Sequence, residues 1–483
     1  MRKPLSLLSA LLLTACVATP PTTPQVSEVK QDQLGLEGAS APHVPADWWK
    51  AFGDPQVDRL AAAVVANNPT LAGALARMRA AQAQLAVNQA EDLPQVTLDG
   101  SEQRTLFSKD YIIPPPYGGT WRWFGSLTTN LSWNLDFWGK QAALIAQARD
   151  KSLAAALDAD AAHLALSGAF AQAYINLLLN YQYGDIADAT VREREEILKI
   201  SQGRFDAGLE NGSDVAQARS LLSIARADQL RFAAAREMDV HAIAALAGQG
   251  ADAYADIKRP TPNLDVALPL PERLPADLLA RRPDILAAQA RIQAAVEGRK
   301  AAHADFYPDI NLAAIAGFQA IGLSNLLTGN SFTVGVGPAI HLPIFDAGAL
   351  RAQLKGRYAD FELDVANYNQ ALINAMSDVA TQVSSIRAID KEMSDAQRAL
   401  DASTQAYRLA VIRYKAGLSP QLQVLTADSN RLAAEQTVTN LEMKRRDLQF
   451  ALIRALGGGF DAQAAGVAVP ASGPLAAASP SAG

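Results

Sequence analysis

The chain has 483 residues, of which 49% are hydrophobic, and its 43 basic and 49 acidic residues give a formal net charge of −6. A chain of this length can bury a large core, and an acidic balance disfavours a nucleic-acid partner, whose phosphates bind basic surfaces. After the N-terminal segment, no stretch offers the roughly eighteen consecutive apolar residues of a membrane-spanning helix. If the chain crosses a membrane, we therefore expect it to do so with strands.

The N-terminus has the pattern of a secreted protein. Arg2 and Lys3 precede an apolar run that is too short to span a bilayer as a stable helix, which predicts a signal peptide over residues 1–15. Leu13-Thr14-Ala15-Cys16 resembles the bacterial lipobox, whose cysteine is acylated and becomes the first mature residue. Val17, in place of an acidic residue, implies sorting to the outer membrane. Residues 16–54 then form a lipid-anchored N-terminal segment.

Cys16 is the single cysteine of the chain, so it cannot be half of an intramolecular disulfide. This supports lipid attachment at Cys16. The alternative is an ordinary secretory peptide with an incidental cysteine.

An internal repeat divides the rest of the chain. The stretch from Asn68 to Leu71 matches Arg282 to Ile285 at an offset of 214 residues, and Arg204 to Leu209 matches Arg413 to Leu418 at an offset of 209. A register kept through several matches predicts two tandem copies of one unit. We place them at residues 55–249 and 282–456, separated by a Pro-rich equatorial linker at 250–281. A disordered tail rich in Gly, Ala, Pro and Ser follows at 457–483.

Each copy is expected to contain two strands, about 95–107 and 121–137 in the first and about 309–319 and 331–345 in the second. From Trp121 to Phe137 apolar and polar residues alternate, which predicts one apolar and one polar face. Pro338 predicts a bulge or a local loss of ladder bonding in the last strand. An antiparallel sheet covering a soluble core would show the same alternation.

Aromatic placement favours a membrane sheet. Trp121 and Trp123 lie ten to twelve residues from Trp133, which on a strand tilted by about 45° separates them by roughly 25 Å, the height of the lipid-facing band of an outer-membrane barrel. The predicted membrane girdle is Trp121, Trp123, Trp133 and Phe137. Four strands cannot close a barrel, and open edges in lipid cost several kcal/mol for each unbonded backbone group. We therefore expect other copies of the chain to complete it.

The long helices are predicted as hairpins over about 138–249 and 346–456. From Leu350 to Ile386 apolar residues recur with a mean spacing of 3.6, which predicts one helix over about 349–415, roughly 100 Å long. Gly208 and Gly417 stand where each hairpin must reverse, since glycine adopts the left-handed conformation at little cost.

Together these features resemble the TolC/NodT-type outer-membrane efflux lipoproteins. Two local stretches add to the resemblance: Leu278 to Ile285 is similar to the family's DLLxRRPDI stretch, and Gly337 to Gly348 is similar to its strand-to-helix junction. The resemblance spans roughly residues 47 to 457. It implies an α+β membrane protein in which a trimeric transmembrane β-barrel, with four strands per subunit, continues into a long periplasmic α-helical barrel.

The same resemblance implies a function and partners. The chain would be the outer-membrane channel subunit of a tripartite efflux system, passively exporting small molecules or drugs. Its partners would be two further copies in a homotrimer, a periplasmic adaptor (membrane fusion) protein, an inner-membrane efflux pump of the resistance-nodulation-division type, and outer-membrane lipid. The alternatives are the duct of a type I protein secretion system and a periplasmic adaptor lipoprotein.

No catalytic, metal or cofactor motif stands out. The histidines are dispersed, and the sequence has no HExxH pair, no GxSxG and no phosphate loop. We therefore expect no enzymatic activity, no metal and no cofactor. The five histidines are His43, His163, His241, His303 and His341.

The resemblance also assigns residues at the periplasmic end. The turns Gly208-Leu209 and Gly417-Leu418 would contact the adaptor. An acidic residue after the first turn tethers neighbouring helices in the family, and Asp214 stands there, while Tyr414 matches a tyrosine that donates to it. Alternatively, Ser213 or Asp214 caps the start of a helix.

This sequence departs from the family at other aperture positions. Ser419 replaces an arginine, so the ionic half of the tether is missing. Gln423 and Thr426 stand where acidic rings are common, and Asp428, which a helical step rotates about 200° from Thr426, is their candidate substitute.

Overall fold

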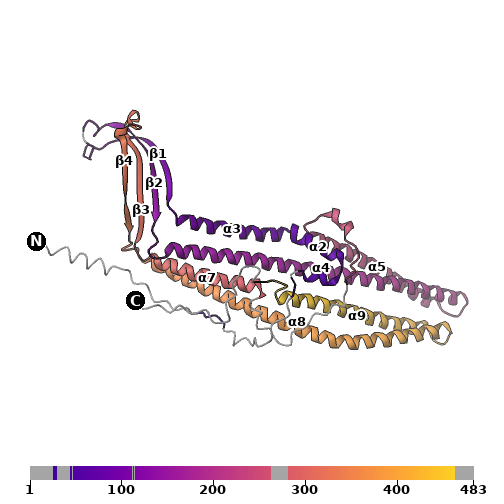
Figure 1. The fold of residues 1–483 in the computed structure, drawn as a ribbon. Coiled ribbons are helices and arrows are strands. Elements are labelled where there is room, and N and C mark those ends of the chain that lie inside the picture. The colour runs from indigo at the N-terminus through magenta and orange to yellow at the C-terminus, as the bar shows by residue number, and fades with distance from the viewer. Residues whose placement is uncertain are drawn as a thin grey trace. The chain divides into compact units, whose positions relative to one another are not determined.

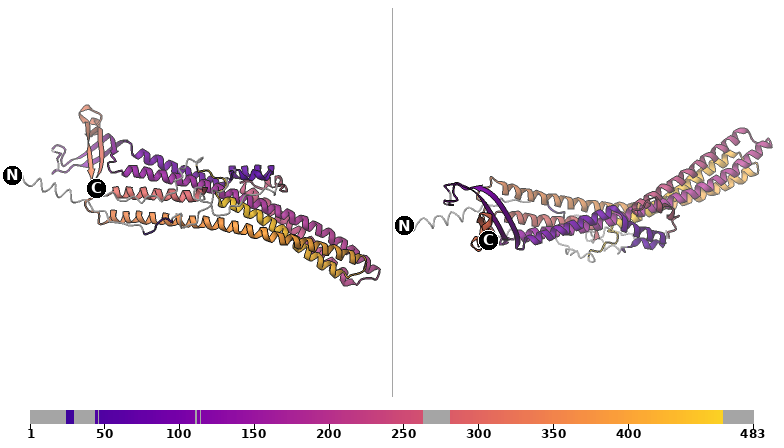
Figure 2. Two further views of the ribbon diagram at one scale, coloured as in Figure 1. Left: turned by 60° about the horizontal axis from the view of Figure 1, so that its bottom comes forward. Right: turned by 90° about the horizontal axis from the view of Figure 1, so that it is seen from above.

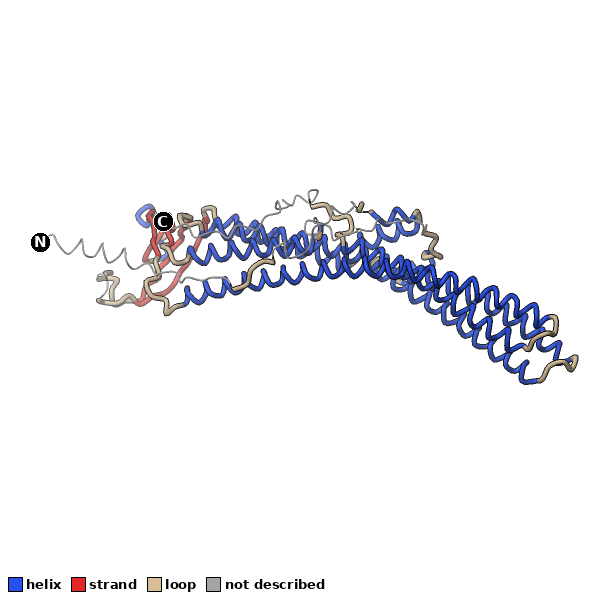
Figure 3. The backbone as a smooth tube through the Cα atoms, turned by 90° about the horizontal axis from the view of Figure 1, so that it is seen from below, coloured by secondary structure: helices blue, strands red, loops and turns tan. Residues whose placement is uncertain are grey.

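The computed structural model describes residues 25–29, 44–45, 47–110, 112–113, 115–262 and 281–462, without the side chains of residues 51 and 52. The predictions for residues 1–15, for Cys16, and for most of the linker and tail lie outside these residues. The described chain is mostly helical and contains one sheet (Figure 3). It divides into two compact units. The sheet unit comprises residues 25–28, Arg77–Ala156 and Ala287–Asn369, and the hairpin unit comprises the described parts of Val29–Ala76, Leu157–Leu286 and Gln370–Gly483.

The sheet has four antiparallel strands in the order β1-β2-β3-β4 (Figure 1). They are β1 (Gln95–Leu106), β2 (Trp121–Asn134), β3 (Asp309–Ile321) and β4 (Phe332–His341). β1 and β4 are the two edges of this sheet.

Two strands end earlier than the sequence predicts. β2 stops at Asn134 instead of residue 137, because the Phe137 amide turns back to the Leu135 carbonyl at 2.9 Å. β4 stops at His341 instead of residue 345, shortly before Pro343, which has no amide hydrogen to donate. The pairing of β3 with β4 continues unbroken past Pro338, so the predicted bulge is absent. Pro338 lacks an amide hydrogen, so it costs β4 at most one ladder bond.

The main helices come in pairs of nearly equal length. α4 (Lys140–Asp206) and α8 (Ala349–Lys415) have 67 residues each, about 100 Å at 1.5 Å per residue, and α8 has the predicted bounds. α5 (Gly212–Leu246) and α9 (Gln421–Ala455) have 35 residues each. Within the hairpin unit, both views of Figure 2 show the two hairpins running side by side to their turns. The remaining elements are η2 (Trp48–Phe52), α2 (Pro55–Asn67), α3 (Pro69–Glu91), η3 (Ala251–Asp256), α7 (Pro283–Ala304), η4 (Leu323–Asn325) and η5 (Gly329–Ser331).

The core of the hairpin unit explains the most apolar part of α4. By length and composition alone, α4 contains an 18-residue window hydrophobic enough to cross a membrane, although its apolar residues are not consecutive. In the structure Phe170, Tyr174 and Leu177 pack in a cluster with α2 and α5 residues such as Leu60 and Ile243. Core burial therefore accounts for the hydrophobicity of this segment.

Asp54 joins three parts of the hairpin unit. It caps α2 by accepting from the Gln56 amide at 2.9 Å, and it also accepts from the Tyr174 hydroxyl of α4 at 2.6 Å. The amide of Thr261 donates to the same carboxylate at 2.9 Å. Asp54 is almost fully buried, so these three donors replace the water it loses. One carboxylate thus fastens α2 and residues 258–262 to α4.

Two glycines approach the backbone closely at matching places. Gly248 follows α5 and Gly457 follows α9, both with positive φ. A Cβ at Gly248 would lie 2.4 Å from the carbonyl oxygen of Asn67, and one at Gly457 would lie 2.0 Å from that of Arg281. Only glycine fits either contact.

Candidate functional site

The register of the sheet separates its side chains into an apolar and a polar face. Side chains alternate along a strand, and directly paired residues point to the same side. The apolar face carries Val96, Leu98, Trp121, Trp123, Leu127, Leu131, Trp133, Ile310, Leu312, Phe318, Phe332, Val334, Val336 and Ile340. Its polar exceptions are Glu102, Arg104 and Thr129. The polar face carries Thr97, Asp99, Ser101, Gln103, Ser126, Thr128, Asn130, Ser132, Asn311 and Gln319.

Side chains of the apolar face are exposed to solvent in the single chain. Val96, Leu98, Val334 and Val336 are each more than 60% exposed. Soluble monomers rarely expose a contiguous apolar surface of this kind, and large ones mark partner or membrane contacts. The apolar face therefore has the chemistry of a lipid-contacting surface, whereas the polar face has the chemistry of a surface in contact with water.

Three of the four predicted girdle residues lie on the apolar face. Trp121 and Trp123 begin β2 and Trp133 lies near its end, and all three rings are exposed. Trp133 Nε1 donates to the Asp92 carbonyl at 3.1 Å. Phe137 is 64% exposed but lies beyond the end of β2, so the strand register does not place it on either face.

Sequence reasoning missed two further exposed aromatics next to the strands. Trp138 donates from Nε1 to the Pro308 carbonyl at 2.8 Å and stacks on Tyr307 with ring centroids 4.9 Å apart. Phe345 follows β4 and is 89% exposed. The signal that would have found them is their position between a strand and a long helix, where a membrane protein carries amphipathic rings.

The two hairpin turns share one geometry. In the first, the Leu209 amide donates to the Arg204 carbonyl at 2.8 Å and the Gly208 amide to Phe205 at 2.9 Å. In the second, Leu418 and Gly417 make the same pair of bonds to Arg413 and Tyr414. These are Schellman motifs, which need the positive φ that both glycines have.

The turns present exposed apolar side chains. Leu209 and Leu418 are 67% and 72% exposed. Each follows the glycine whose left-handed conformation reverses the chain, so the turn geometry itself presents the leucine to solvent.

Asn211 caps α5, in contrast to the expectation that Ser213 or Asp214 does so. Its Oδ1 accepts from the Ser213 amide at 2.8 Å and from the Asp214 amide at 3.2 Å. Asp214 therefore lies in the first turn of the helix, where a negative charge favours the helix dipole. Among the described residues its carboxylate has no ion-pair partner, so it remains available to another group.

Tyr414 lies between the two hairpins and is only 2% exposed. It packs with Ile197, Ala218 and Val424, and the Arg204 guanidinium lies 5.1 Å from its ring centroid. Burial, with the neighbouring Glu210 carboxylate, raises the pKa of Tyr414.

The structure does not join Tyr414 to Asp214. No hydrogen bond links the two side chains. The groups nearest the Tyr414 hydroxyl among the described residues are Glu210 and Ser201, and neither meets it with hydrogen-bond geometry. The neighbouring carboxylate is instead that of Glu210, which accepts from Arg204 Nε at 2.8 Å and from Ser201 Oγ at 2.9 Å.

The other aperture candidates divide by exposure. Ser419 is buried, and its hydroxyl lacks a partner among the described residues. Gln423 and Thr426 are exposed on α9, and the Thr426 hydroxyl donates to the Leu422 carbonyl at 2.8 Å. Neither side chain carries a charge.

Asp428 is fully buried, which does not fit a free carboxylate lining an aperture. It lies 2.7 Å from Arg194 of α4 and 2.9 Å from Arg431 of its own helix. Arg431 also pairs with Glu193 of α4 and with Glu435 at 3.1 Å. These five residues form an ionic cluster that links α4 to α9, and sequence reasoning missed it.

Burial at the ionic cluster shifts the pKa values of Glu193 and Tyr407. Burial raises the pKa of Glu193, which Arg431 only partly offsets. The Arg431 guanidinium lies 4.9 Å from the Tyr407 ring centroid. Burial, together with Asp428 and Glu193, raises the pKa of Tyr407 to about 12.

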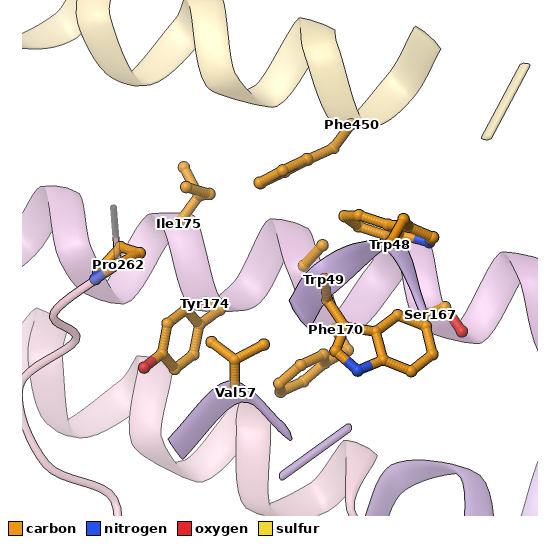
Figure 4. A pocket seen from close by; sticks show the side chains of 10 residues that line it. Trp48, Trp49, Val57, Ser167, Phe170, Tyr174, Ile175, Pro262 and Phe450 are labelled. Atoms are coloured by element: carbon orange, nitrogen blue, oxygen red, sulfur yellow. The ribbon is translucent and has the colours of Figure 1, made fainter. Parts of the chain in front are cut away.

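A small apolar pocket lies within the hairpin unit (Figure 4). Figure 4 shows the rings of Trp48, Phe170 and Phe450 around it. Ser167 of the lining donates to the His163 carbonyl at 2.9 Å, and the Tyr174 hydroxyl donates to Asp54 at 2.6 Å. The apolar lining residues belong to two neighbouring core clusters, so the pocket is explained as a gap between them.

Comparisons with known proteins agree with this geometry. A family model described as Outer membrane efflux protein matches residues 60–249 and 274–458. The fusaric acid resistance protein FusA of Burkholderia cepacia is 35% identical over 354 residues, covering 71% of this chain and 67% of that protein. The pyoverdine export outer membrane protein OpmQ of Pseudomonas aeruginosa is 30% identical over 479 residues, covering 96% and 99%. Among solved structures, the outer membrane protein VceC of Vibrio cholerae has a TM-score of 0.81 at 33% identity, covering 86% of this chain and 99% of that one.

Proposed function

The chain belongs to the outer membrane efflux protein family, and we propose from this that it is the outer-membrane channel subunit of a tripartite efflux system. The observation that carries the proposal is the sheet, whose one face is apolar and open while the other is polar. Such a sheet separates lipid from water. Purified protein in a planar bilayer should give discrete ion conductance, and a membrane that stays insulating would contradict the channel role.

The substrates are small molecules. Fusaric acid resistance and pyoverdine export are the roles named for two relatives, and both concern small molecules. Their names therefore support small-molecule export over protein secretion. A strain lacking the chain should accumulate an exported drug, while its secreted proteins should be unchanged. Loss of a secreted protein instead would favour the type I secretion alternative.

The channel is a homotrimer. β1 and β4 are edge strands, and an edge in lipid leaves backbone groups unbonded at several kcal/mol each. Three copies pairing β1 of one with β4 of the next would close a barrel of twelve strands and continue into a periplasmic helical barrel. Native mass analysis in detergent should find a trimer, and a stable monomer that retains its full strand signal would contradict the shared barrel.

Two tandem repeats build each subunit. The equal lengths of α4 and α8, and of α5 and α9, support this proposal. So do the close contacts at Gly248 and Gly457, which occupy matching places with the same offsets as the sequence repeats.

A lipid on Cys16 anchors the subunit in the outer membrane. The amide of Gln25 donates to Glu362 Oε1 at 2.7 Å, and Asn369 donates to the Ser27 carbonyl at 3.0 Å, which fixes this segment against α8. Cys16 lies nine residues before Gln25, a span of at most about 30 Å, whereas Glu362 lies about 20 Å along α8 from Ala349. The segment from Cys16 to Gln25 is therefore long enough for Cys16 to lie beside the first residues of α8.

Anchoring can be tested by metabolic labelling with a fatty acid. Cys16→Ser should lose the label yet keep the conductance of the parent, because strands and not acyl chains close the barrel. Continued labelling of the variant would contradict lipid attachment at Cys16.

The hairpin turns contact a periplasmic adaptor, which links the channel to an inner-membrane pump. Exposed Leu209 and Leu418, each fixed by its glycine, offer matched apolar contacts. Cross-linking from these positions in cells should capture an adaptor, and a matched cross-linker at exposed Leu230 on α5 should not. Equal capture from both places would contradict a specific role for the turns.

The residues Asp214, Gln423 and Thr426 line the aperture. Tyr414 and Ser419 are buried within the subunit, so their hydroxyls take part only through hydrogen bonds made in the assembled channel. Asp214 supplies its free carboxylate, and we assign Asp428 instead to the ionic cluster that holds α4 and α9 together. Asp214→Ala should raise single-channel conductance if this carboxylate restrains the aperture. Unchanged conductance would leave Asp214 as a residue that only favours the helix dipole.

The channel role requires neither catalysis nor a cofactor. Among the described residues, no group of three His, Cys, Asp or Glu side chains is placed to hold a metal ion. The family assignment supports transport as the activity of the chain.

A further inference from the structure

Asp99 is the charged side chain in the middle of the polar face of the sheet. The other charges on this face lie at its ends: Arg122 near the start of β2, and Asp309 opposite His341 where β3 begins. Between them the face carries uncharged side chains, most of them hydroxyl, amide or small, together with Phe124, Ile315 and Ile321. Asp99 thus sets the electrostatic character of the central part of this face.

Two donors hold the Asp99 carboxylate in place. Asn130 on β2 donates from Nδ2 to Asp99 Oδ2 at 2.7 Å, and the Thr97 hydroxyl donates to the same oxygen at 3.1 Å. Both donors suit a carboxylate, which accepts hydrogen bonds with both oxygens. Asp99 Oδ1 remains free of these bonds, and the side chain is exposed. The charge is therefore fixed at one level of the sheet and faces solvent.

In the proposed barrel the electric field of this carboxylate reaches the channel axis. Twelve strands spaced by about 4.8 Å and tilted by about 45° close at a radius of about 13 Å, which places each carboxylate roughly 10 Å from the axis. The Debye length is about 10 Å in 0.1 M salt and about 3 Å in 1 M salt. Three carboxylates are therefore felt across the lumen in dilute salt and screened in concentrated salt.

We infer that Asp99 makes the sheet-lined part of the channel prefer cations to anions, and so favours positively charged over negatively charged solutes. This inference rests on the proposed function and on the trimer. Three unit charges about 10 Å away, screened over one Debye length in water, change the cation-to-anion permeability ratio by about four-fold. The same charges change it by only about 1.2-fold in 1 M salt.

Arg122 opposes this preference from the outer end of the face. It lies opposite Thr105, six residues or about 20 Å along β1 from Asp99. Its Nε donates to the Thr120 hydroxyl at 3.3 Å, and its guanidinium lies 5.6 Å from the Tyr117 ring centroid. Because it lies about two Debye lengths away in 0.1 M salt, it leaves the field at Asp99 largely intact.

The test is the reversal potential of the full chain in a planar bilayer under a KCl gradient around 0.1 M. Asp99→Asn keeps the hydrogen-bonding shape and removes the charge, so the permeability ratio should move toward unity by about four-fold, and by about 1.2-fold near 1 M. Glu102→Gln is the matched control, because Glu102 lies on the same strand but points to the apolar face. Arg122→Gln should shift the ratio in the opposite direction.

A second readout separates the sheet from the rest of the pore. Hexamminecobalt(III), a trivalent cation, should block the parent from the side of the β1–β2 loop more strongly than it blocks Asp99→Asn. Equal ratios and equal block in Asp99→Asn and the parent would overturn the assignment of Asp99 while leaving the channel intact. A shift of the same size in Glu102→Gln would also overturn it. If no variant conducts, the proposed channel function itself fails.

Discussion

Asn68 and Arg282 stand at equivalent places before α3 and α7, and each donates a side-chain hydrogen bond to the last carbonyl of a hairpin helix. Asn68 Nδ2 lies 2.8 Å from the carbonyl oxygen of Leu246, and Arg282 Nη1 lies 3.3 Å from that of Ala455. The last carbonyls of a helix have no partner within it, so each contact satisfies a group that would otherwise be orphaned. Different side chains thus perform one task in the two halves.

Asn68→Ala is therefore expected to destabilise the hairpin unit by about 1–2 kcal/mol. The change removes the bond to Leu246 and the capping bonds from the Thr70 and Leu71 amides to Asn68 Oδ1. Denaturation followed by far-ultraviolet circular dichroism measures the loss. Gln84→Ala, at an exposed position of α3, is the control and should change the free energy of unfolding by less than about 0.5 kcal/mol. Equal effects of the two changes would contradict the role of Asn68.

Asp428→Ala should be far more costly. It leaves Arg194 and part of the charge of Arg431 buried without a counter-ion, and breaking a buried pair costs about 3–5 kcal/mol. Replacing Arg194 and Asp428 together with leucine should recover much of this loss, because the uncompensated Arg194 charge is then gone. The control is Asp395→Ala, which breaks an exposed pair with Arg398 and should have no measurable effect. A small effect of Asp428→Ala would mean that water reaches the ionic cluster.

Glu193 gives the ionic cluster a pH dependence. Burial raises its pKa in the folded protein, so between the ordinary glutamate value of about 4.3 and this raised value the folded state binds more protons than the unfolded state. The contribution of Glu193 to stability therefore grows as the pH falls and is lost as the pH rises through the folded pKa. The midpoint of thermal unfolding of the parent, relative to Glu193→Gln, should be higher near pH 5 than near pH 7.5. Glu195→Gln, at an exposed neighbouring position, should show no such dependence. If the midpoint of the parent instead falls relative to that of Glu193→Gln on acidification, the pKa of Glu193 is lowered in the folded protein and not raised.

Gly317 should tolerate no side chain. A Cβ at this position would lie 2.2 Å from the Leu127 carbonyl oxygen and 2.6 Å from the Thr128 Cα, so β2 and β3 would have to separate. We expect Gly317→Ala to reduce the yield of folded, membrane-inserted protein several-fold. Gly337→Ala is the matched control, since Gly337 lies on β4 and a Cβ added there would have no neighbouring atom within 4 Å. Normal insertion of both variants would show that the strands can part without loss.

Tyr414→Phe should leave the stability of the subunit unchanged or slightly higher. The hydroxyl is buried without a hydrogen-bond partner in the described residues, and an unsatisfied buried polar group costs about 1–3 kcal/mol. The ring, which packs between the hairpins, is retained. A destabilisation of more than about 1 kcal/mol would show that the hydroxyl is bonded in the assembled channel, as the aperture proposal requires. Thermal unfolding in detergent distinguishes the two results.

The sequence was a good guide to those features that depend on local pattern. The 3.6-residue spacing of apolar side chains predicted a long helix where α8 lies, and the glycines at 208 and 417 predicted both turns, because each signal lies within the element that it specifies. The ends of β2 and β4 were wrong by several residues. Strand ends depend on where the neighbouring strand stops bonding, which the alternation of one strand does not contain.

The candidate site was less predictable where distant residues meet. Nothing near Asp428 in the sequence identifies Arg194, more than two hundred residues earlier, as its partner. The rotation of about 200° from Thr426 already indicated that the two side chains cannot share a face, and the structure has one exposed and the other buried. The Asn211 cap, in contrast, was readable, since asparagine is among the preferred capping residues.

α4 has the same length as α8, and α5 has the same length as α9. These equal lengths limit which insertions the two hairpins can accept. One residue inserted into α4 would turn every later side chain by 100° and move the core residues of that helix away from α5 and α9, whereas seven residues would turn them by only about 20°. Seven residues added to α4 would require seven more in α5, so that the chain returns to the close contact at Gly248. The same two additions would be needed in α8 and α9 to keep Tyr414 packed against the first hairpin. Lengthening of the hairpins is therefore expected only as four coordinated insertions of about seven residues, while the strand-connecting loops can change by one residue at a time.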